Sequence, residues 1–245
     1  MNRLLMLPGW GFPSAVFSVL KEKLASDFIV MTPDCPGYGK DDDQSDSELQ
    51  GNEEPVSLSS PALVLGWSLG GINAMQLALR QPDMVTGLIL LATTPCFVKR
   101  QDWRTGMDKS TFATFQNQVK EDPASAMQQF VRLNAAAKPD RESRDVLVRL
   151  SGNVVAAALQ NGLNELENTD LRYAACSITA PALLMHATDD RVVPVAASHW
   201  LHEHLLRSQF IEFPSGGHAF FIQHAATVVD RIREFINEVC NDRKT

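Results

Sequence analysis

Hydrophobic residues along the chain fall into short runs that are separated by longer segments with helical spacing. Six mostly apolar runs bounded by turn-forming residues lie at positions 4–7, 28–31, 62–65, 86–92, 182–185 and 210–213. Runs that are apolar throughout are typical of strands buried on both faces, which occur in parallel sheets. We therefore predict about six strands of one mostly parallel central sheet at these positions.

Between several of these runs the apolar residues follow the 3.6-residue period of a helix. Such segments lie at positions 15–24, 72–80 and 196–206. Because strands that alternate with helices are joined by crossovers, they pair in parallel, and the helices cover both faces of the sheet. The pattern predicts an α/β fold with a doubly wound sheet.

One region breaks this alternation. Positions 95–170 contain no convincing strand run, but they contain helical patterns such as "STFATFQNQVKED" and "DPASAMQQFVRLNAA". The region is too long for a plain connection between strands. We predict a helical cap inserted at 95–170 into a core formed by 1–94 and 171–245, over the sheet edge where open α/β sheets bind ligands.

Composition limits the classes of protein that fit. With 245 residues, of which 44% are hydrophobic, the chain can build one sizeable core. The formal charge is −7, but positions 41–55 hold seven of the 29 acidic residues, which leaves 22 acidic against 22 basic residues elsewhere. The acidity is local, and we expect no nucleic-acid partner. Pro55 opposes a long helix in this acidic segment, so we expect a surface stretch there.

The sequence offers no sign of export, membrane insertion or metal binding. The start "MNRLLMLPGWGF" has too short an apolar run for a signal peptide, and no apolar stretch is long enough to span a membrane. The four cysteines show no C-x-x-C spacing. We expect a cytoplasmic protein, a monomer, with no membrane partner, no metal and no organic cofactor.

A serine in the stretch "LVLGWSLGGINAMQLAL" carries the main chemical signal. Gly66 to Gly70 fit the pattern G-x-S-x-G, with a predicted strand before and a predicted helix after it. In that setting the serine occupies a sharp, strained turn, and glycines are needed because side chains would collide with the neighbouring backbone. Ser68 is therefore a candidate nucleophile.

A serine nucleophile needs a base and a carboxylate that orients the base. His218 follows a predicted strand in "FIEFPSGGHAFF", and Asp190 follows another in "ATDDRVVP". The order Ser68, Asp190, His218 matches one known type of hydrolase. Asp189 remains an alternative to Asp190. The other histidines fit a solvated helix face or lack a comparable loop: His199, His202, His204, His186 and His224.

The oxyanion of an acyl-transfer intermediate needs two hydrogen-bond donors. The backbone N–H of Leu69, directly after the nucleophile, is one candidate. The loop "LPGWGF" after the first strand offers the N–H of Trp10 as the second. Flanking glycines favour a place for Trp10 beside a pocket.

The motifs "PGWG", "DCPGYGK", "GWSLGG", "DDRVVP" and "GGHAFF" occur in the order seen in the α/β-hydrolase superfamily, which the chain resembles over nearly its whole length. Within it, "GWSLGG" with "TTPCFV" and "NTDLR" resembles the pimeloyl-acyl carrier protein methyl ester esterases of biotin synthesis. The resemblance implies Ser68 as nucleophile, Asp190 as acid, His218 as base, and Trp10 and Leu69 as oxyanion donors. The superfamily's usual His-Gly is Pro8-Gly9 in this chain, but the donor is a backbone N–H, so we expect activity to survive.

The resemblance implies a serine carboxylesterase that hydrolyses a methyl ester of an acyl chain carried on acyl carrier protein. A broad-specificity carboxylesterase for short-chain esters would keep the same triad and lack only the preference for the carrier. The same fold also hosts C–C hydrolases, haloperoxidases and non-catalytic receptors for small ligands. Labelling of Ser68 by a fluorophosphonate would separate an enzyme from a receptor.

We expect two sets of residues to contact the substrate. The first is aromatic: Trp67, Phe97 and Phe130. The second is a set of cap arginines that an acidic carrier would contact: Arg132, Arg141, Arg144 and Arg149. Arg141 and Arg144 share a helix face at i, i+3 spacing. A solvated face interleaved with Asp140, Glu142 and Asp145 explains the same arginines equally well.

Overall fold

The computed structural model describes residues 2–34, 37–38, 56–135, 141–151 and 155–242, and the acidic segment 41–55 lies outside them. Six strands form one sheet in the order β2-β1-β3-β4-β5-β6, and every pair is parallel. The strands are β1 (Asn2–Leu7), β2 (Phe28–Met31), β3 (Ala62–Trp67), β4 (Val85–Leu91), β5 (Ala182–Ala187) and β6 (Ser208–Phe213). The prediction of about six mostly parallel strands is confirmed.

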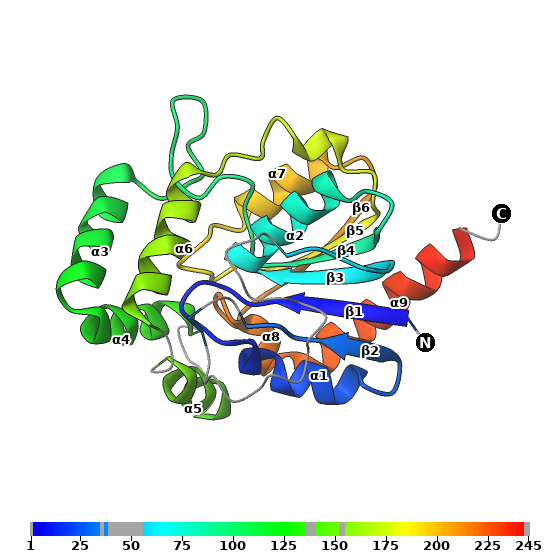
Figure 1. The fold of residues 1–245 in the computed structure, drawn as a ribbon, viewed down its shortest axis with the longest axis horizontal. Helices are drawn as coiled ribbons and strands as arrows, with labels where there is room; N and C mark the ends of the chain where they lie inside the picture. Colours follow the sequence, from blue (N-terminus) through cyan, green and yellow to red (C-terminus); the bar gives the residue numbers. More distant parts are fainter. Residues whose placement is uncertain (1, 35–36, 39–55, 136–140, 152–154, 243–245) are drawn as a thin grey trace.

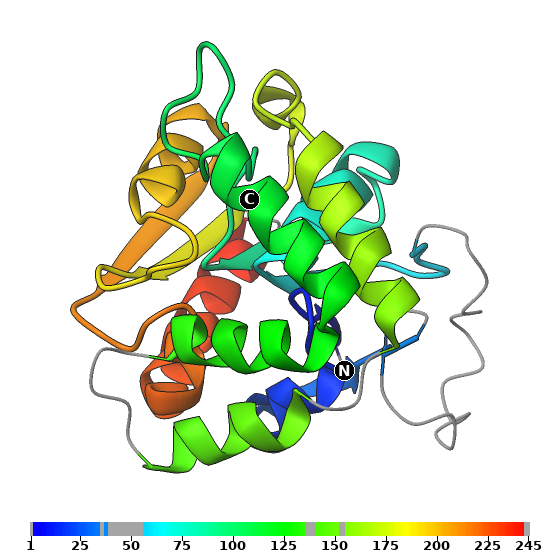
Figure 2. The ribbon, with the colours of Figure 1, turned by 90° about the vertical axis from the view of Figure 1, so that its left-hand side faces the viewer.

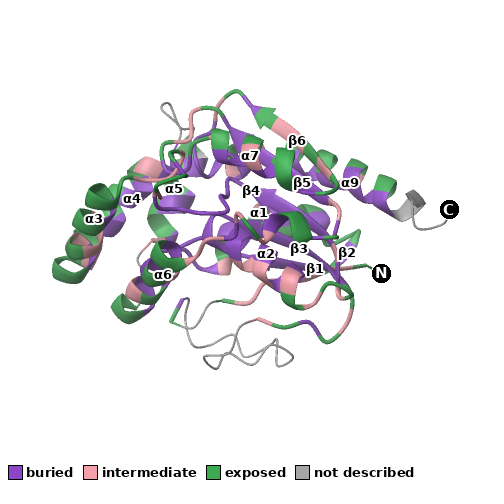
Figure 3. Cartoon of the chain, turned by 90° about the horizontal axis from the view of Figure 1, so that it is seen from above, coloured by how far each residue is buried: buried purple, intermediate pink, exposed green. Residues whose placement is uncertain are grey.

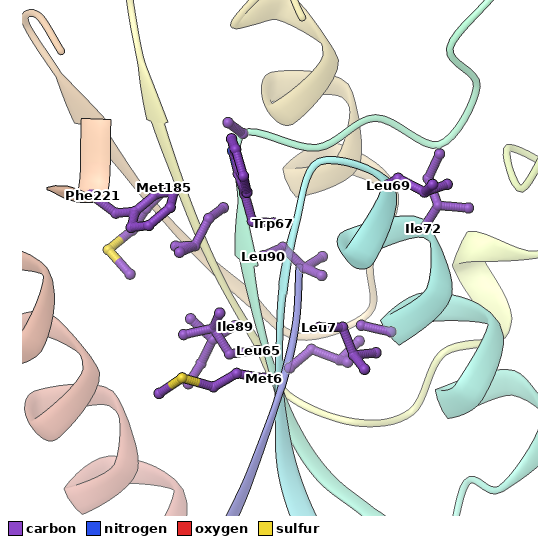
Figure 4. Packing of buried hydrophobic residues seen from close by; sticks show 14 of the residues in the cluster. Met6, Leu7, Leu65, Trp67, Leu69, Ile72, Ile89, Leu90, Met185 and Phe221 are labelled. Carbon is purple, nitrogen blue, oxygen red and sulfur yellow. The ribbon is translucent and has the colours of Figure 1, made fainter. Parts of the chain in front are cut away.

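The apolar runs of the sequence form strands because both faces of the sheet are covered. Every residue of β3 and β5 is buried, whereas the edge strands β2 and β6 are only partly buried. Met6 and Leu7, neighbours on β1, point to opposite sides of the sheet (Figure 4). Burying apolar surface on both sides supplies the main driving force for this layered core.

Helices pack against both faces of the sheet (Figure 1). Those of the core are α1 (Ser18–Leu24), α2 (Leu69–Arg80), α7 (Ala196–His204), α8 (Phe220–Gln223) and α9 (Ala225–Asp242). On one face lie α2 and α7, and on the other lie α1, α8 and α9. The helix expected at 15–24 begins as a 3-10 turn, Ser14–Phe17, before α1. The helix expected at 196–206 ends two residues earlier, at His204.

Four further helices lie beyond the carboxyl ends of the strands (Figures 1 and 2). They are α3 (Lys109–Glu121), α4 (Pro123–Asn134), α5 (Arg141–Leu150) and α6 (Ala156–Asn168). At the start of α4, the Asp122 carboxylate accepts a hydrogen bond from the Ser125 N–H at 3.0 Å, and Pro123 occupies the first turn. These helices alternate buried and exposed positions, unlike the central strands β3 and β5 (Figure 3).

The two chain segments that connect these four helices to the sheet run side by side. Cys96 and Asp170 form an antiparallel bridge, and the Leu171 N–H donates to the Pro95 carbonyl at 2.8 Å. Within the described part of 95–170 the backbone forms such isolated bridges rather than strands. The helical region therefore leaves and re-enters the core at one place.

A buried arginine reinforces this place. Arg172 binds Asp170 through two hydrogen bonds of 2.9 and 2.7 Å and reaches Asp102 at 3.0 Å. Its guanidinium also lies 5.6 Å from the ring centres of Trp103 and Tyr173. The hydrogen bonds from Arg172 hold the pKa of the Asp170 carboxyl below its usual value. The contact between Arg172 and Asp102 thus joins the two segments.

Candidate active site

Ser68 lies in a strained turn between β3 and α2. Its φ of 56° is in the left-handed region that non-glycine residues rarely adopt. A Cβ at Gly66 would overlap the carbonyl oxygen of Gly70, and one at Gly70 would overlap that of Leu7. The glycines of the motif are therefore required by close backbone packing around the serine.

Hydrogen bonds from β4 and the segment after it hold this turn. The Ser68 N–H donates to the Leu91 carbonyl at 2.9 Å, and the Thr93 hydroxyl donates to the Ser68 carbonyl at 2.7 Å. Thr93 is fully buried, so its hydroxyl needs such a partner. Thr93 was included in the sequence analysis only within the motif "TTPCFV", and no role was predicted for it. A polar residue directly after the apolar run at 86–92 could have indicated one.

The carboxylate that contacts His218 belongs to Asp190. Asp190 Oδ2 lies 2.7 Å from His218 Nδ1, and both side chains are fully buried. The other oxygen, Oδ1, accepts from the N–H groups of Val192 at 2.7 Å and Val193 at 2.9 Å. The neighbouring Asp189 instead accepts the Gly217 N–H at 2.8 Å, which fixes the loop that carries His218.

Burial raises the pKa of the Asp190 carboxyl, but the electrostatic attraction and hydrogen bonds of the His218 and His186 rings outweigh it. The balance leaves the pKa of Asp190 well below its usual value, so the group is a carboxylate at neutral pH.

His218 has a free nitrogen where a base needs one. With Nδ1 donating to Asp190, the neutral ring presents Nε2 as an acceptor. Nε2 is buried and makes no hydrogen bond with any described residue. The Trp67 indole N–H donates to the His218 carbonyl at 2.9 Å, and the two ring centres are 5.5 Å apart. Because Trp67 precedes Ser68 in the chain, this contact holds His218 beside the serine turn.

The two backbone groups expected as oxyanion donors flank Ser68. Leu69 is the first residue of α2, so its N–H has no acceptor within the helix. Trp10 follows β1, and a Cβ at the preceding Gly9 would lie 3.2 Å from the Ser68 Cβ. The loop after β1 therefore passes alongside the serine, at the positive end of the α2 dipole.

A cavity of about 300 Å³ opens beside Ser68, and α3, α4 and α6 contribute residues to its wall. Trp10, Phe97 and Phe130, all expected near the substrate, line it. The Trp10 ring packs edge-on against Phe130 at 4.8 Å, and its N–H donates to the Leu159 carbonyl at 2.8 Å. Most of the remaining wall is apolar, and its polar members are Thr111, Thr114, Gln118, Gln129 and Arg191.

Trp67 does not line this cavity, contrary to the expectation that it contacts the substrate. The residue is 1% exposed, and its ring packs against Phe12 and Phe221 in the core. Its indole N–H is directed to the loop of His218 rather than to the cavity. The expectation was wrong because the motif fixes where the backbone of Trp67 runs and leaves the direction of its side chain open.

The four arginines expected to meet a carrier also lie outside the cavity wall. Arg132 is exposed on α4, and Arg141, Arg144 and Arg149 are exposed on α5. Arg141 pairs with Asp145 at 3.6 Å, an exposed contact of the kind that a solvated helix face also makes.

Sequence reasoning missed a second histidine at the Asp190 carboxylate. His186, in β5, is fully buried, and its Nε2 lies 2.9 Å from Asp190 Oδ2. A histidine inside an otherwise apolar strand run was the available signal. His199, His202 and His204 are exposed on α7, where a solvated helix face was expected.

Among the described residues, no group of three or more His, Cys, Asp or Glu side chains is placed to hold a metal ion. Among the helices of the described chain, none is long and apolar enough to cross a membrane.

The family model of the alpha/beta hydrolase fold matches residues 2–225 of the chain. A pimeloyl-acyl carrier protein methyl ester esterase from Nitrosomonas europaea is 35% identical over 227 residues, with 89% of each chain covered. The protein of that name from Xanthomonas campestris pv. campestris is 33% identical over 239 residues, covering 95% of this chain and 94% of its own.

Solved structures share the fold at lower identity. An esterase from Exiguobacterium antarcticum has a TM-score of 0.85 at 22% identity, covering 97% of this chain and 92% of its own. A bromoperoxidase from Bacillus anthracis has a TM-score of 0.83 at 18% identity, with 97% and 92% covered. Identities this low establish the fold alone. Together with the sequence relatives, they show that the chain belongs to the alpha/beta hydrolase fold family.

Proposed function

We propose that this protein is a serine carboxylesterase that hydrolyses the methyl ester of pimeloyl-acyl carrier protein, a step of biotin synthesis. The observation that carries the chemistry is the 2.7 Å contact between Asp190 and His218, which leaves His218 Nε2 without a hydrogen-bond partner among the described residues. Ser68 lines the cavity. The substrate is supported by relatives of that name that are 33–35% identical over most of the chain.

The reaction proceeds through an acyl-enzyme. Ser68 Oγ attacks the ester carbonyl carbon while His218 Nε2 takes its proton. The N–H groups of Trp10 and Leu69 stabilise the oxyanion. The C–O bond to the methoxy group then breaks, and the proton on His218 passes to the leaving oxygen to give methanol. Water, deprotonated by His218, attacks the acyl-enzyme; the bond to Ser68 Oγ breaks, His218 returns the proton to this oxygen, and the carboxylic acid is released. Asp190 stabilises the imidazolium in both halves of the cycle.

The cavity wall suits an aliphatic acyl chain. Phe97, Phe112, Phe115 and Phe130 surround the space next to Ser68. Each methylene group buried there contributes about 0.8 kcal/mol to binding. We further propose that 95–170 act as a cap on the core of 1–94 and 171–245, so that the cap sets the shape of the acyl site.

The cap arginines are the proposed contact for the acidic carrier. Arg132, Arg141, Arg144 and Arg149 are exposed on α4 and α5, which lie at the cavity end of the molecule. Charge complementarity of this kind acts mainly on association rates and is weakened by salt. Reversing one charge, as in Arg144→Glu, should raise the KM for the carrier-bound ester a few-fold and leave the KM for a free ester unchanged. An equal effect on both esters would contradict the contact.

A general carboxylesterase for short acyl esters is the second candidate. The mostly apolar wall, with few polar groups placed to select a substrate, favours it. This enzyme would turn over small esters as well as it turns over the carrier-bound ester.

The deciding experiment compares the purified protein on three substrates: pimeloyl-acyl carrier protein methyl ester, the free methyl ester, and a short p-nitrophenyl ester. Ser68→Ala is the control. A large preference in kcat/KM for the carrier-bound ester, abolished by Ser68→Ala, supports the proposal. Turnover of the small esters alone would move the protein to the general carboxylesterases. Absence of fluorophosphonate labelling at Ser68 in folded protein would instead favour a receptor.

A further inference from the structure

His186 is a buried polar residue that the proposed triad does not use. It is the fifth residue of β5, and no part of it is exposed to solvent. An imidazole in such a place is costly unless each nitrogen has a partner. Nε2 lies 2.9 Å from Asp190 Oδ2 and 3.0 Å from the Val193 carbonyl, and Nδ1 lies 2.7 Å from Ser198 Oγ.

The partners determine which nitrogen carries the proton. A carboxylate and a carbonyl only accept hydrogen bonds, so Nε2 of His186 is the donor. Nδ1 of the neutral ring then accepts the hydroxyl proton of Ser198, which is itself fully buried on α7. Ser198 thus holds the ring in the tautomer that donates to Asp190, with no charge needed on His186.

As a result, one carboxylate oxygen serves two histidines. Asp190 Oδ2 accepts from His186 and from His218 at 2.7 Å, while Oδ1 accepts the two backbone N–H groups of Val192 and Val193. Four N–H donors from β5, the loop after it and the loop after β6 therefore fix the carboxylate plane.

We propose that His186 is a positioning residue, which holds Asp190 in line with His218 and withdraws part of the charge that Asp190 offers to it. This inference rests on the proposed function of the triad. The titratable groups against Asp190 are His186 from β5 and His218 from the loop after β6. The flanking Asp189 binds the Gly217 N–H, and Arg191 donates to the carbonyls of Arg132 and Ala135.

Because Asp190 Oδ2 is shared by two histidines, loss of the His186 donor should shift the pH profile of kcat/KM in a defined direction. Without the His186 donor, Oδ2 becomes a stronger acceptor and stabilises the protonated ring of His218 more. His218 would then stay protonated to higher pH, and a protonated ring cannot act as base. The acidic limb of the kcat/KM profile therefore moves to higher pH when the donor is lost, and the freer carboxylate lowers kcat.

Two amide substitutions form a matched pair. In His186→Gln the side-chain amide nitrogen takes the position of Nε2 and still donates to Asp190. In His186→Asn the shorter amide reaches only the position of Nδ1, so the donor is lost. We expect His186→Asn to lower kcat roughly tenfold with little change in KM, and to move the acidic limb upward by about half a pH unit. His186→Gln should keep the acidic limb of the kcat/KM profile near its position in the unsubstituted protein and should keep most of kcat.

A purely structural role for His186 predicts a different result. If His186 only supports the fold, its substitution would reduce the fraction of protein that reacts with a fluorophosphonate. The acidic limb of the kcat/KM profile of the reactive protein would then not move in either variant. That result would overturn the proposal. Loss of turnover in both variants with the limb unchanged would overturn it as well.

A measurement on the unsubstituted protein keeps the proposal testable even where a variant does not fold. Nitrogen-15 NMR of labelled histidine should find the proton of His186 on Nε2, with Nδ1 as an acceptor. A proton on Nδ1 alone would overturn the proposal, because Nε2 could not then donate to Asp190. Failure of the triad itself is distinguished by Ser68→Ala: full turnover in that variant would refute the proposed function, whatever the state of His186.

Discussion

The core and the helices of the proposed cap hold their side chains around the cavity in different ways. In the core, Ser68, Asp190 and His218 are fixed by backbone strain and by hydrogen bonds of 2.7 to 2.9 Å between fully buried groups. In the cap helices, the residues that face the cavity are mostly aromatic and aliphatic and pack without fixed direction. The difference indicates that the chemistry tolerates almost no displacement of atoms, whereas the acyl site tolerates exchange of side chains.

The largest expected effect comes from the carboxylate of the core. Asp190→Asn removes the acceptor that sets the tautomer of His218, so kcat should fall about 10⁴-fold for every ester tested. Steady-state kinetics on a carrier-bound and a free ester measure this. A loss confined to the carrier-bound ester would mean that Asp190 serves recognition rather than chemistry.

The next effect tests the backbone packing around Ser68. In Gly70→Ala the added methyl group would overlap the carbonyl oxygen of Leu7, so β1 and α2 must separate. We expect the free energy of unfolding to fall by about 3 kcal/mol, with loss of the reactive serine turn. Urea unfolding and fluorophosphonate labelling are the readouts, and Gly87→Ala, within β4, offers a control away from the turn. Normal labelling with unchanged stability would contradict the packing argument.

The place where core and cap join should give an intermediate effect. Asp170→Asn leaves Arg172, whose side chain is only 8% exposed, with one of its two carboxylate partners. The unfolding free energy should fall by about 2 kcal/mol at neutral pH.

The pH dependence of that loss follows from the lowered pKa of Asp170. A carboxylate whose pKa is lower in the folded state stabilises the protein above its unfolded pKa of about 3.9 and stops doing so as pH falls through its folded pKa. The difference in unfolding free energy between the unsubstituted protein and Asp170→Asn should therefore be largest at pH 7 and become smaller below about pH 4. A gap that stays constant down to pH 3 would exclude the ion pair as its cause.

The smallest effect concerns the hydroxyl that supports the serine turn. Thr93→Val keeps the shape of the side chain but removes the hydrogen bond to the Ser68 carbonyl. We expect a loss of about 1 kcal/mol in unfolding free energy and a few-fold lower kcat. Thr93→Ser, which keeps the hydroxyl, is the matched control, and equal kcat in the two variants would argue against the hydrogen bond.

Much of the fold and the place of the serine followed from the sequence because both depend on local patterns. Apolar runs became strands, and glycines around Ser68 marked a turn that only glycine permits. Asp189 and Asp190 could not be separated with certainty, since adjacent residues of a loop differ only in the direction of their side chains. The structure pairs Asp190 with His218 and Asp189 with the Gly217 N–H.

Side-chain direction also explains what the sequence concealed. His186 and Ser198 are twelve positions apart and meet only because α7 packs on β5. Trp67 has the motif context of a pocket residue, yet its ring packs in the core and its N–H meets the loop of His218. Neither arrangement depends on a local propensity, so no pattern of spacing predicts it.

The bridge between Cys96 and Asp170 has a consequence for protein engineering. The ends of the proposed cap therefore lie next to each other, and segments with adjacent ends can be replaced without moving the rest of the fold. A foreign lid grafted between positions 96 and 170 would keep β4 and β5 in register. In this fold the residues around Ser68 and the helices that shape the acyl site can therefore change independently of each other.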